Sequence, residues 1–370
     1  MLPPPGVEGY GSLYRRGGYE KDQEKELRMR KKVFLPFVEE PLLTAYHSNA
    51  FPIGIVQANA QKDLTPWLCC KYINCYYADR MSKNKFDIST SDPWFTDEGV
   101  LQHEAIDLQW GNYALLGLDV LPMLKRMLTA GYYVRGLYDE RYIPGKSAYG
   151  KYSYIHDFLL IGYHNPQNVF FSVGYTERGK FERYEIPYDC FYQSIACRAG
   201  RQITFDFYRF RPDANLVFNM LRVYRGCNDY LKSKNYEKEL RKGRVFGMAA
   251  VRQLKHLFAR TYRQEGAIDS RYTRLLMEHK YLMAARMKYL YHEGYFGNDF
   301  AVTASENVYE NAKRVHLLGI KTNMTGDART AEHVLQRMQA ILEEETGYLC
   351  KAVELVHTIV ETYWREHPAR

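Results

Sequence analysis

The 370-residue sequence lacks most of the short motifs that identify an enzyme class. It has no glycine-rich phosphate loop, no Gly-x-Ser-x-Gly turn and no His-Glu-x-x-His motif, so nucleotide-binding, α/β-hydrolase and zinc-protease sites are not indicated. Its seven cysteines form no Cys-x-x-Cys pair and no His/Cys group with zinc spacing. We therefore expect no metal, no cofactor and no disulfide framework.

Long apolar runs are also missing. No window approaches the 18 or so continuous apolar residues that a membrane-spanning helix needs, so we expect no membrane partner. The first residues, MLPPPGVEGYGSLYRRGGYEKD, lack the apolar stretch of a secretory signal. Together with the absence of paired cysteines, this predicts a cytoplasmic protein.

The charge is only mildly unbalanced. The formal net charge is +8, from 51 Lys and Arg against 43 Asp and Glu, which favours acidic partners weakly. The densest basic run, Arg28–Lys32, is short and is best explained as a solvated segment, so we expect no nucleic-acid partner. Tyrosine is abundant, with 33 residues, and its apolar ring and terminal hydroxyl suit half-buried sheets and wet clefts.

The pattern along the chain predicts an α+β protein of two domains after a flexible arm at residues 1–30. Residues 31–204 should hold short strands over 32–38 and 42–59, which are broken by Pro36, Pro41 and Pro52. A helix over 64–81, a second helical region over 113–131 and an antiparallel meander over 132–190 should follow. Residues 205–370 should form an all-helical domain, since apolar residues recur there at helical spacing between glycine breaks.

Two regions resemble a known family. The run GYYVRGLYDERYIP…YIHDFLLIGYHNPQNVFFSVGYTERGKFERYEIPYDCF (131–191) resembles the sheet half of papain-type cysteine-peptidase-like proteins related to butirosin biosynthesis protein H, relatives of the bacteriocin-leader peptidases. The segments FGMAAVRQLKHLF, DSRYTRLLMEHKYLMAARMKYL, ENVYENAKRVHLLGIKTN and ILEEETGYL resemble the helical extension of such proteins. The resemblance covers roughly residues 40–350.

The resemblance implies a papain-like domain over 31–204, with N-terminal helices and an antiparallel sheet, followed by the helical domain. It also implies an acyl or peptidyl transferase, or a thioesterase, that acts on a peptide or carrier-protein-bound intermediate in nonribosomal peptide or polyketide biosynthesis. The expected partners are an acyl or peptidyl carrier protein with its phosphopantetheine thioester, and a small-molecule or peptide substrate. A homodimer is left open.

Carried over to this chain, the family's general base is His156, in the segment YIHD. The thiol nucleophile should stand at the first turn of the helix predicted over 64–81, where this chain has no cysteine. The candidates are Cys69 and Cys70, with Cys75 less favoured. Cys70 shares a helical stripe with apolar residues, so a buried core position is favoured for it over a catalytic one.

The third member of a triad is not evident from the sequence. Asn168 and Glu177 lie at the margins of the strand after His156, and Asp157 should point to the opposite face of its strand. In the segment YDERY, Asp139 and Arg141 should share a face, for which a plain ion pair is favoured. The alternative to an enzyme is therefore a catalytically degenerate relative that serves as a carrier-protein- or metabolite-binding scaffold.

Overall fold

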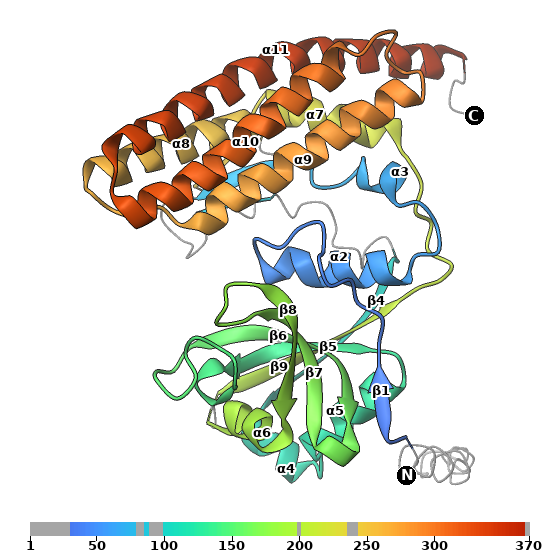
Figure 1. Ribbon diagram of the computed structural model, residues 1–370. Helices are drawn as coiled ribbons and strands as arrows, with labels where there is room; N and C mark the ends of the chain where they lie inside the picture. Colours follow the sequence, from blue (N-terminus) through green and yellow to red (C-terminus); the bar gives the residue numbers. More distant parts are fainter. Residues whose placement is uncertain (1–29, 79–84, 89–98, 198–200, 235–242, 367–370) are drawn as a thin grey trace, which may run out of the picture. The chain divides into compact units, whose positions relative to one another are not determined.

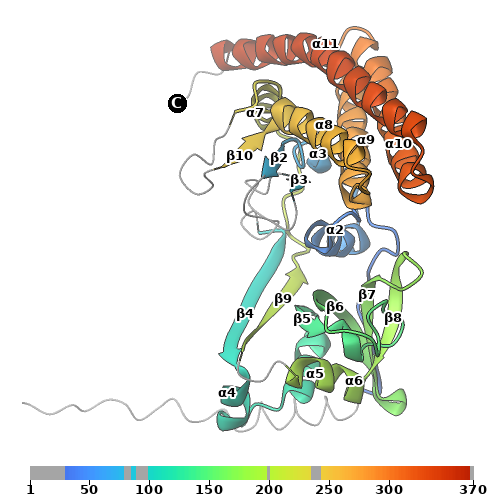
Figure 2. The ribbon, with the colours of Figure 1, turned by 90° about the vertical axis from the view of Figure 1, so that its left-hand side faces the viewer.

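The structure is a computed structural model that describes residues 30–78, 85–88, 99–197, 201–234 and 243–366. The chain forms two compact units, drawn in Figures 1 and 2. Residues 1–39 and 103–209 belong to the first, here called the sheet unit, and residues 40–102 and 210–370 to the second, here called the helical unit. Each unit is described by itself.

The sheet unit is built on one antiparallel sheet. Its strands lie in the order β4-β9-β5-β6-β7-β8, and β1 pairs with β6 beside this path. The bounds are β1 Lys32–Phe34, β4 Leu101–Gln109, β5 Tyr133–Asp139, β6 Ile155–His164, β7 Val169–Tyr175, β8 Phe181–Pro187 and β9 Gln202–Phe210. The predicted antiparallel meander over 132–190 is confirmed as β5 to β8.

A register shift between Leu160 and Gly162 divides β6 into two halves. Its first half pairs with β5, and its last three residues pair with β1. A Cβ atom at Gly162 would stand 2.3 Å from the carbonyl oxygen of Val33, so β1 can approach this closely only because residue 162 is glycine. The bulge thus lets one strand take two partners along a single edge.

Helices of the sheet unit share one apolar core with the sheet. These are α4 (Trp110–Leu115), α5 (Val120–Thr129) and α6 (Tyr188–Ala196), and short 3-10 turns follow β5 (η1, Glu140–Tyr142) and β6 (η2, Asn165–Gln167). Helix α5 buries Val120, Leu124 and Leu128, which recur every four residues, as expected of an amphipathic helix. The core also contains sheet residues of alternate positions and α6 side chains, among them Val134, Phe158, Phe205 and Phe191.

The helical unit consists mainly of long helices in its C-terminal part. Helix α9 packs against α10, and α11 packs against α10, α7 and α8. A small antiparallel sheet of order β10-β2-β3 completes the unit. The bounds are α2 His47–Asn59, α3 Thr65–Leu68, β2 Cys75–Ala78, β3 Phe86–Ile88, α7 Met220–Leu231, β10 Arg244–Phe246, α8 Gly247–Arg263, α9 Ser270–His292, α10 Phe300–Thr325 and α11 Ala328–Glu366.

The predicted helices after residue 210 are confirmed. Gly326 ends α10 in the left-handed conformation, with φ of 66°, and the Asp327 carboxylate then accepts hydrogen bonds from Thr330 N–H and Oγ1–H. Such a glycine and a following acidic cap are the signals that end one helix and begin the next. Residues 205–370 are nevertheless not all helical, because they include part of β9 and all of β10.

Two predictions in the N-terminal half are wrong. Residues 47–59 form helix α2 and not strands, and within it His47, Asn49 and every residue from 50 to 56 are buried. A helix buried on all sides shows no polar face, so its apolar residues do not reveal a helical period. The helix predicted over 64–81 is only the four residues of α3. Tyr72 has φ of 54°, and the chain continues as strand β2.

No helix in the described ranges is both long enough and apolar enough to cross a membrane.

Candidate active site

The imidazole of His156 is paired with a carboxylate within the sheet unit. Its Nδ1 lies 2.9 Å from Oε1 of Glu140, whose side chain is only 9% exposed, whereas that of His156 is 33% exposed. An ionised carboxylate can only accept, so Nδ1–H donates and the neutral ring keeps the lone pair of Nε2. This is the arrangement by which a general base is held in one tautomer and one orientation.

The turn that carries Glu140 is fixed by its neighbour Asp139. The Asp139 carboxylate accepts hydrogen bonds from the backbone N–H of Arg141 at 3.0 Å, the backbone N–H of Tyr154 at 2.9 Å and the hydroxyl of Ser153 at 2.6 Å. Although partial burial alone would raise it, these hydrogen bonds hold the pKa of Asp139 below its usual range. The N–H of Glu140 donates to the Tyr154 carbonyl at 2.9 Å, so the ends of β5 and β6 are joined beside His156.

Acidic and basic side chains alternate from the other ring nitrogen across the sheet. Nε2 of His156 lies 3.7 Å from Oδ1 of Asp157, and Asp157 lies 3.4 Å from the Arg135 guanidinium. Arg135 is 3.9 Å from Asp206, which in turn contacts Nε2 of His103 at 2.9 Å. The 3.7 Å separation is too long for a hydrogen bond, so Asp157 acts on the ring as a nearby charge.

Near Nε2 of His156, the described residues of the sheet unit offer few possible ligands for a metal ion. His156 and Asp157 would supply two ligand atoms. Catalytic zinc sites take three protein ligands, so these two groups by themselves do not make such a site.

The other residues considered for the third position lie elsewhere. Asn168 follows the turn η2 in the left-handed conformation, and its neighbour Val169 pairs with His164 at the far end of β6. Eight residues of strand separate His156 from His164, which is about 27 Å at 3.4 Å per residue. Glu177 donates its N–H to the Gly145 carbonyl in a turn after β7. Neither residue has a described contact with His156.

The predicted thiols belong to the interior of the helical unit. Cys69 is 3% exposed and Cys70 is 4% exposed. The Cys70 sulfur accepts a hydrogen bond from the Asn219 N–H at 3.0 Å, and the Cys69 carbonyl accepts one from Nε of Arg286 at 2.7 Å. Burial raises the pKa of the Cys69 thiol to about 12, despite the positive charge of Arg286, and it raises the pKa of Cys70 as well.

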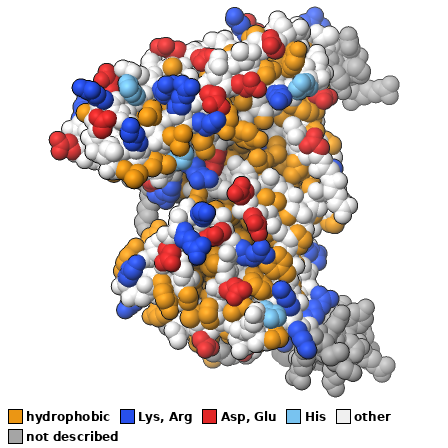
Figure 3. All heavy atoms as spheres, in the orientation of Figure 1, with side chains coloured by type: hydrophobic (Ala, Val, Ile, Leu, Met, Phe, Trp, Pro, Cys, Tyr) orange, Lys and Arg blue, Asp and Glu red, His pale blue; other side chains and the backbone are white. Residues whose placement is uncertain are grey.

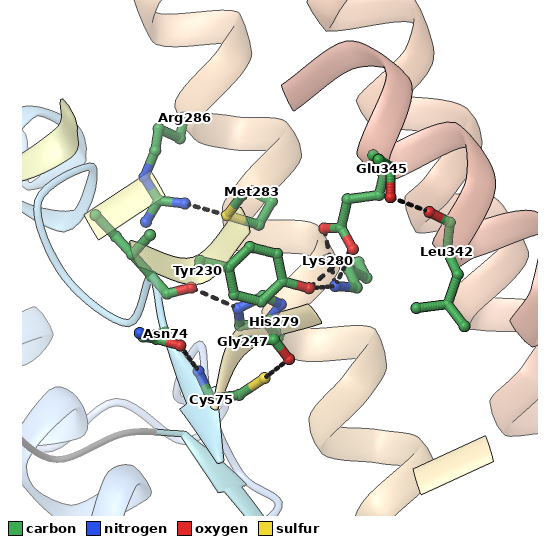
Figure 4. A network of polar contacts seen from close by, with 12 residues as sticks. Asn74, Cys75, Tyr230, Gly247, His279, Lys280, Met283, Arg286, Leu342 and Glu345 are labelled. Carbon is green, nitrogen blue, oxygen red and sulfur yellow. Dashed lines mark hydrogen bonds and ion pairs between the residues drawn. The ribbon is translucent and has the colours of Figure 1, made fainter. Parts of the chain in front are cut away.

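Cys75 is in strand β2 and is fully buried, with its sulfur 3.7 Å from the carbonyl oxygen of Gly247 (Figure 4). Burial raises the pKa of its thiol to about 12. At pH 7, a thiol with that pKa is a thiolate in roughly one molecule in 10⁵, whereas catalytic cysteines have depressed pKa values. The catalytic role of Cys69 and Cys70 therefore stays a prediction, and their surroundings in the helical unit do not favour it.

Two residues of the sheet unit were missed by sequence reasoning. Glu140 is one, since it stands between Asp139 and Arg141 in the segment YDERY. The other is Cys197, which caps α6, is exposed, and has its sulfur 3.9 Å from Oδ2 of Asp139. The signal for Glu140 is its place directly after a strand that precedes the strand of His156.

Comparison with known proteins adds no identity. No family model matches the chain. No curated protein matches it either.

Proposed function

We propose that this protein is an acyl or peptidyl transferase, or a thioesterase, in which His156 is the general base and Glu140 orients it. The observation that carries the proposal is the 2.9 Å contact between Nδ1 of His156 and the carboxylate of Glu140. A partly exposed imidazole whose second nitrogen is fixed by a buried carboxylate is suited to removing a proton from an incoming nucleophile.

In the proposed reaction, Nε2 takes a proton from an amine or a water molecule as that group attacks the carbonyl carbon of a thioester. The new C–N or C–O bond forms, the C–S bond breaks, and the leaving sulfur accepts the proton from the imidazolium. This direct route needs no protein thiolate, in keeping with the buried thiols of Cys69 and Cys70. A covalent route through one of those thiols is the variant that the family resemblance implies.

The proposed substrate is a peptide or a carrier-protein-bound thioester of nonribosomal peptide or polyketide biosynthesis. Support for this part comes from the resemblance of residues 131–191 and of the helical segments to proteins related to butirosin biosynthesis protein H. The mildly basic net charge of +8 suits an acidic carrier protein.

A second candidate is a binding protein without catalysis. The observation that favours it is the burial of Cys69, Cys70 and Cys75, each at most 4% exposed. A scaffold of this kind would keep the fold and bind the carrier protein or the finished metabolite.

The test is thiol release from an acyl N-acetylcysteamine thioester, with and without an amine acceptor. His156→Ala should lower turnover by roughly 10²- to 10⁴-fold, the usual effect of losing an acid–base group. Glu140→Gln removes a charge-assisted hydrogen bond of about 1.5–3 kcal/mol, so it should lower turnover about 10- to 100-fold.

His164→Ala is the matched control, because His164 lies on the same strand and its ring contacts Gln167 at 2.5 Å. Its turnover should equal that of the unaltered protein. Unchanged turnover in His156→Ala would refute the assignment of the base. A complete lack of turnover in the unaltered protein, with every thioester and acceptor tried, would favour the binding protein.

A further inference from the structure

The connection between β5 and β6 carries three exposed tyrosines, and the last of them lies beside His156. We call residues 141–154 the tyrosine loop. Tyr149 is 48% exposed, Tyr152 55% and Tyr154 45%. Tyrosine is usually at least half-buried in soluble proteins, and clustered exposed aromatic side chains are typical of binding surfaces.

The tyrosine loop has a fixed conformation. Asp139 holds its two ends, and the N–H of Gly150 donates to the Arg141 carbonyl across the loop at 2.9 Å. Ile143 and Ala148 are buried beneath it, with exposed fractions of 0% and 1%. A surface that is ordered before binding loses little conformational entropy when a partner binds.

A buried lysine fastens the middle of the loop to the sheet. Lys146 is 2% exposed, its Nζ donates to the Tyr175 carbonyl at 2.5 Å, and it lies 4.0 Å from the ring centre of Tyr184. The neighbouring Gly145 carbonyl accepts a hydrogen bond from the Glu177 N–H at 2.8 Å. These contacts fix the backbone from which the tyrosines project.

The tyrosine loop carries charge of one sign only. Residues 141–154 include Arg141, Lys146 and Lys151 and contain no Asp or Glu. Arg141 and Lys151 are exposed, and Lys151 Nζ lies 3.1 Å from the Ser147 carbonyl. Exposed tyrosines with two flanking cations are complementary to a surface that combines apolar groups with carboxylates.

A protein partner fits this surface better than a nucleic acid does. Binding to a phosphate backbone uses many cations, commonly six to ten contacts, whereas this loop exposes two. On the face drawn in Figure 3, Lys and Arg side chains are interspersed with Asp and Glu and form no continuous basic stripe.

The tyrosine loop is continuous with the candidate active site. The ring of Tyr154 lies 5.4 Å from the ring of His156, and the Tyr154 carbonyl accepts the Glu140 N–H. We propose that the tyrosine loop is the docking surface for an acidic protein segment, namely the protein that carries the acyl or peptidyl group to His156. This assignment of a partner rests on the proposed function, but the docking itself can be measured without turnover.

The experiment is fluorescence anisotropy with a fluorescein-labelled 15-residue peptide of Glu, Leu, Ala and Ser, compared with the same peptide carrying Lys in place of Glu. The acidic peptide should bind to the full chain and the basic one should bind at least 10-fold more weakly. Raising the salt concentration from about 50 to 300 mM should weaken the acidic complex, because exposed charges are screened over shorter distances.

Two variants locate the binding. The double variant Arg141→Glu with Lys151→Glu, and the triple variant Tyr149→Ser, Tyr152→Ser and Tyr154→Ser, should each lower the affinity at least 10-fold. The matched control is Lys321→Glu with Tyr291→Ser, which changes an exposed lysine and an exposed tyrosine of the helical unit. Its affinity should equal that of the unaltered protein.

A measurement on the unaltered protein guards against misfolded variants. Bound acidic peptide should protect Tyr149, Tyr152 and Tyr154 from hydroxyl-radical oxidation and leave Tyr291 unprotected. Equal affinity for both peptides, or no loss of affinity in the two loop variants together with no protection of the loop, would overturn the proposal. So would tighter binding of a 20-nucleotide single strand or of anionic lipid vesicles that the loop variants abolish.

The His156→Ala variant separates this inference from the proposed function. It should bind the acidic peptide with unchanged affinity, because His156 is not part of the tyrosine loop. Binding that persists without any turnover would retain the docking surface and refute the enzyme. Turnover of a small thioester without peptide binding would do the reverse.

Discussion

Removing Lys280 should strongly destabilise the helical unit. Lys280 of α9 and Glu345 of α11 form an ion pair in which both side chains are 0% exposed. Lys280 Nζ donates to Oε1 of Glu345 at 2.8 Å, to Oε2 at 2.7 Å and to the Tyr230 hydroxyl at 2.6 Å, as Figure 4 shows. All three ammonium protons are therefore used.

Lys280→Met would leave the Glu345 carboxylate buried with the Tyr230 hydroxyl as its remaining donor, at 2.8 Å. An uncompensated buried charge costs about 3–5 kcal/mol, because the solvation lost on folding is no longer offset by the partner. For a unit of this size, about 2–4 °C is lost per kcal/mol, so the melting temperature should fall by about 6–20 °C. Urea unfolding and thermal melts followed by circular dichroism measure both quantities.

The cost should arise from the unpaired charge and not from the loss of the pair itself. The triple variant Lys280→Met, Tyr230→Phe and Glu345→Met removes every polar group of the network, so it should recover most of the lost stability. The exposed pair Lys313–Glu310, 2.8 Å apart, is the control, and Lys313→Met should leave the stability nearly unchanged. A triple variant as unstable as Lys280→Met, or a harmless Lys280→Met, would refute the reasoning.

Two further predictions concern His279 of the helical unit and the reactivity of the cysteine thiols. Burial, with the positive charges of Lys280 and Arg286, holds the pKa of His279 well below its usual range, and its Nδ1 has no hydrogen-bond partner within the described part of the chain. The unfolded chain therefore binds one more proton than the folded chain below about pH 6.5, so the free energy of unfolding should fall by up to about 1.4 kcal/mol per pH unit on acidification. Urea titrations at several pH values measure this slope, which should be smaller for His279→Gln. An equal slope in that variant would contradict this account. Among the cysteines, Cys197 and Cys350 are exposed, and Cys69, Cys70, Cys75 and Cys227 are buried. A thiol-directed electrophile should therefore label the native protein fastest at the exposed cysteines, and should label the buried ones slowly or only after unfolding. Rapid labelling of Cys69 or Cys70 would instead support a catalytic thiol.

The parts of the fold that could be predicted are those in which local pattern and tertiary environment agree. The strands β5 to β8 are bounded by turn residues, and helices α7 to α11 have a buried stripe and clear end signals such as Gly326. The helix predicted over 64–81 failed because Trp67, Cys70, Ile73 and Tyr77 have helical spacing by coincidence. Every residue of β2 is buried, so this run is apolar without alternation and resembles a buried helix.

The place of His156 in the fold was easier to predict than its environment. His156 lies at the start of strand β6, a position that the local sequence can indicate. The exposure of a thiol depends instead on tertiary packing, which the local sequence does not reveal. Cys70 shows this, since its sulfur accepts the N–H of Asn219, a residue 149 positions away. Such contacts are decided by how the helical unit packs and not by the residues around Cys70.

The partner of His156 follows once a single strand pair is known. Tyr138 of β5 pairs with His156 of β6, and Asp139, the last residue of β5, pairs with Ile155. Glu140 follows as the first residue of the turn η1, and its N–H donates to the Tyr154 carbonyl, so the turn lies beside the start of β6. From there its Oε1 lies 2.9 Å from Nδ1 of His156, whereas the Asp139 carboxylate accepts hydrogen bonds from Arg141, Ser153 and Tyr154, and Asp157 lies 3.7 Å from Nε2. The contact between Glu140 and the ring therefore depends on the register of β5 on β6 and on the turn after β5, which are properties of the fold and not of the residues next to the histidine.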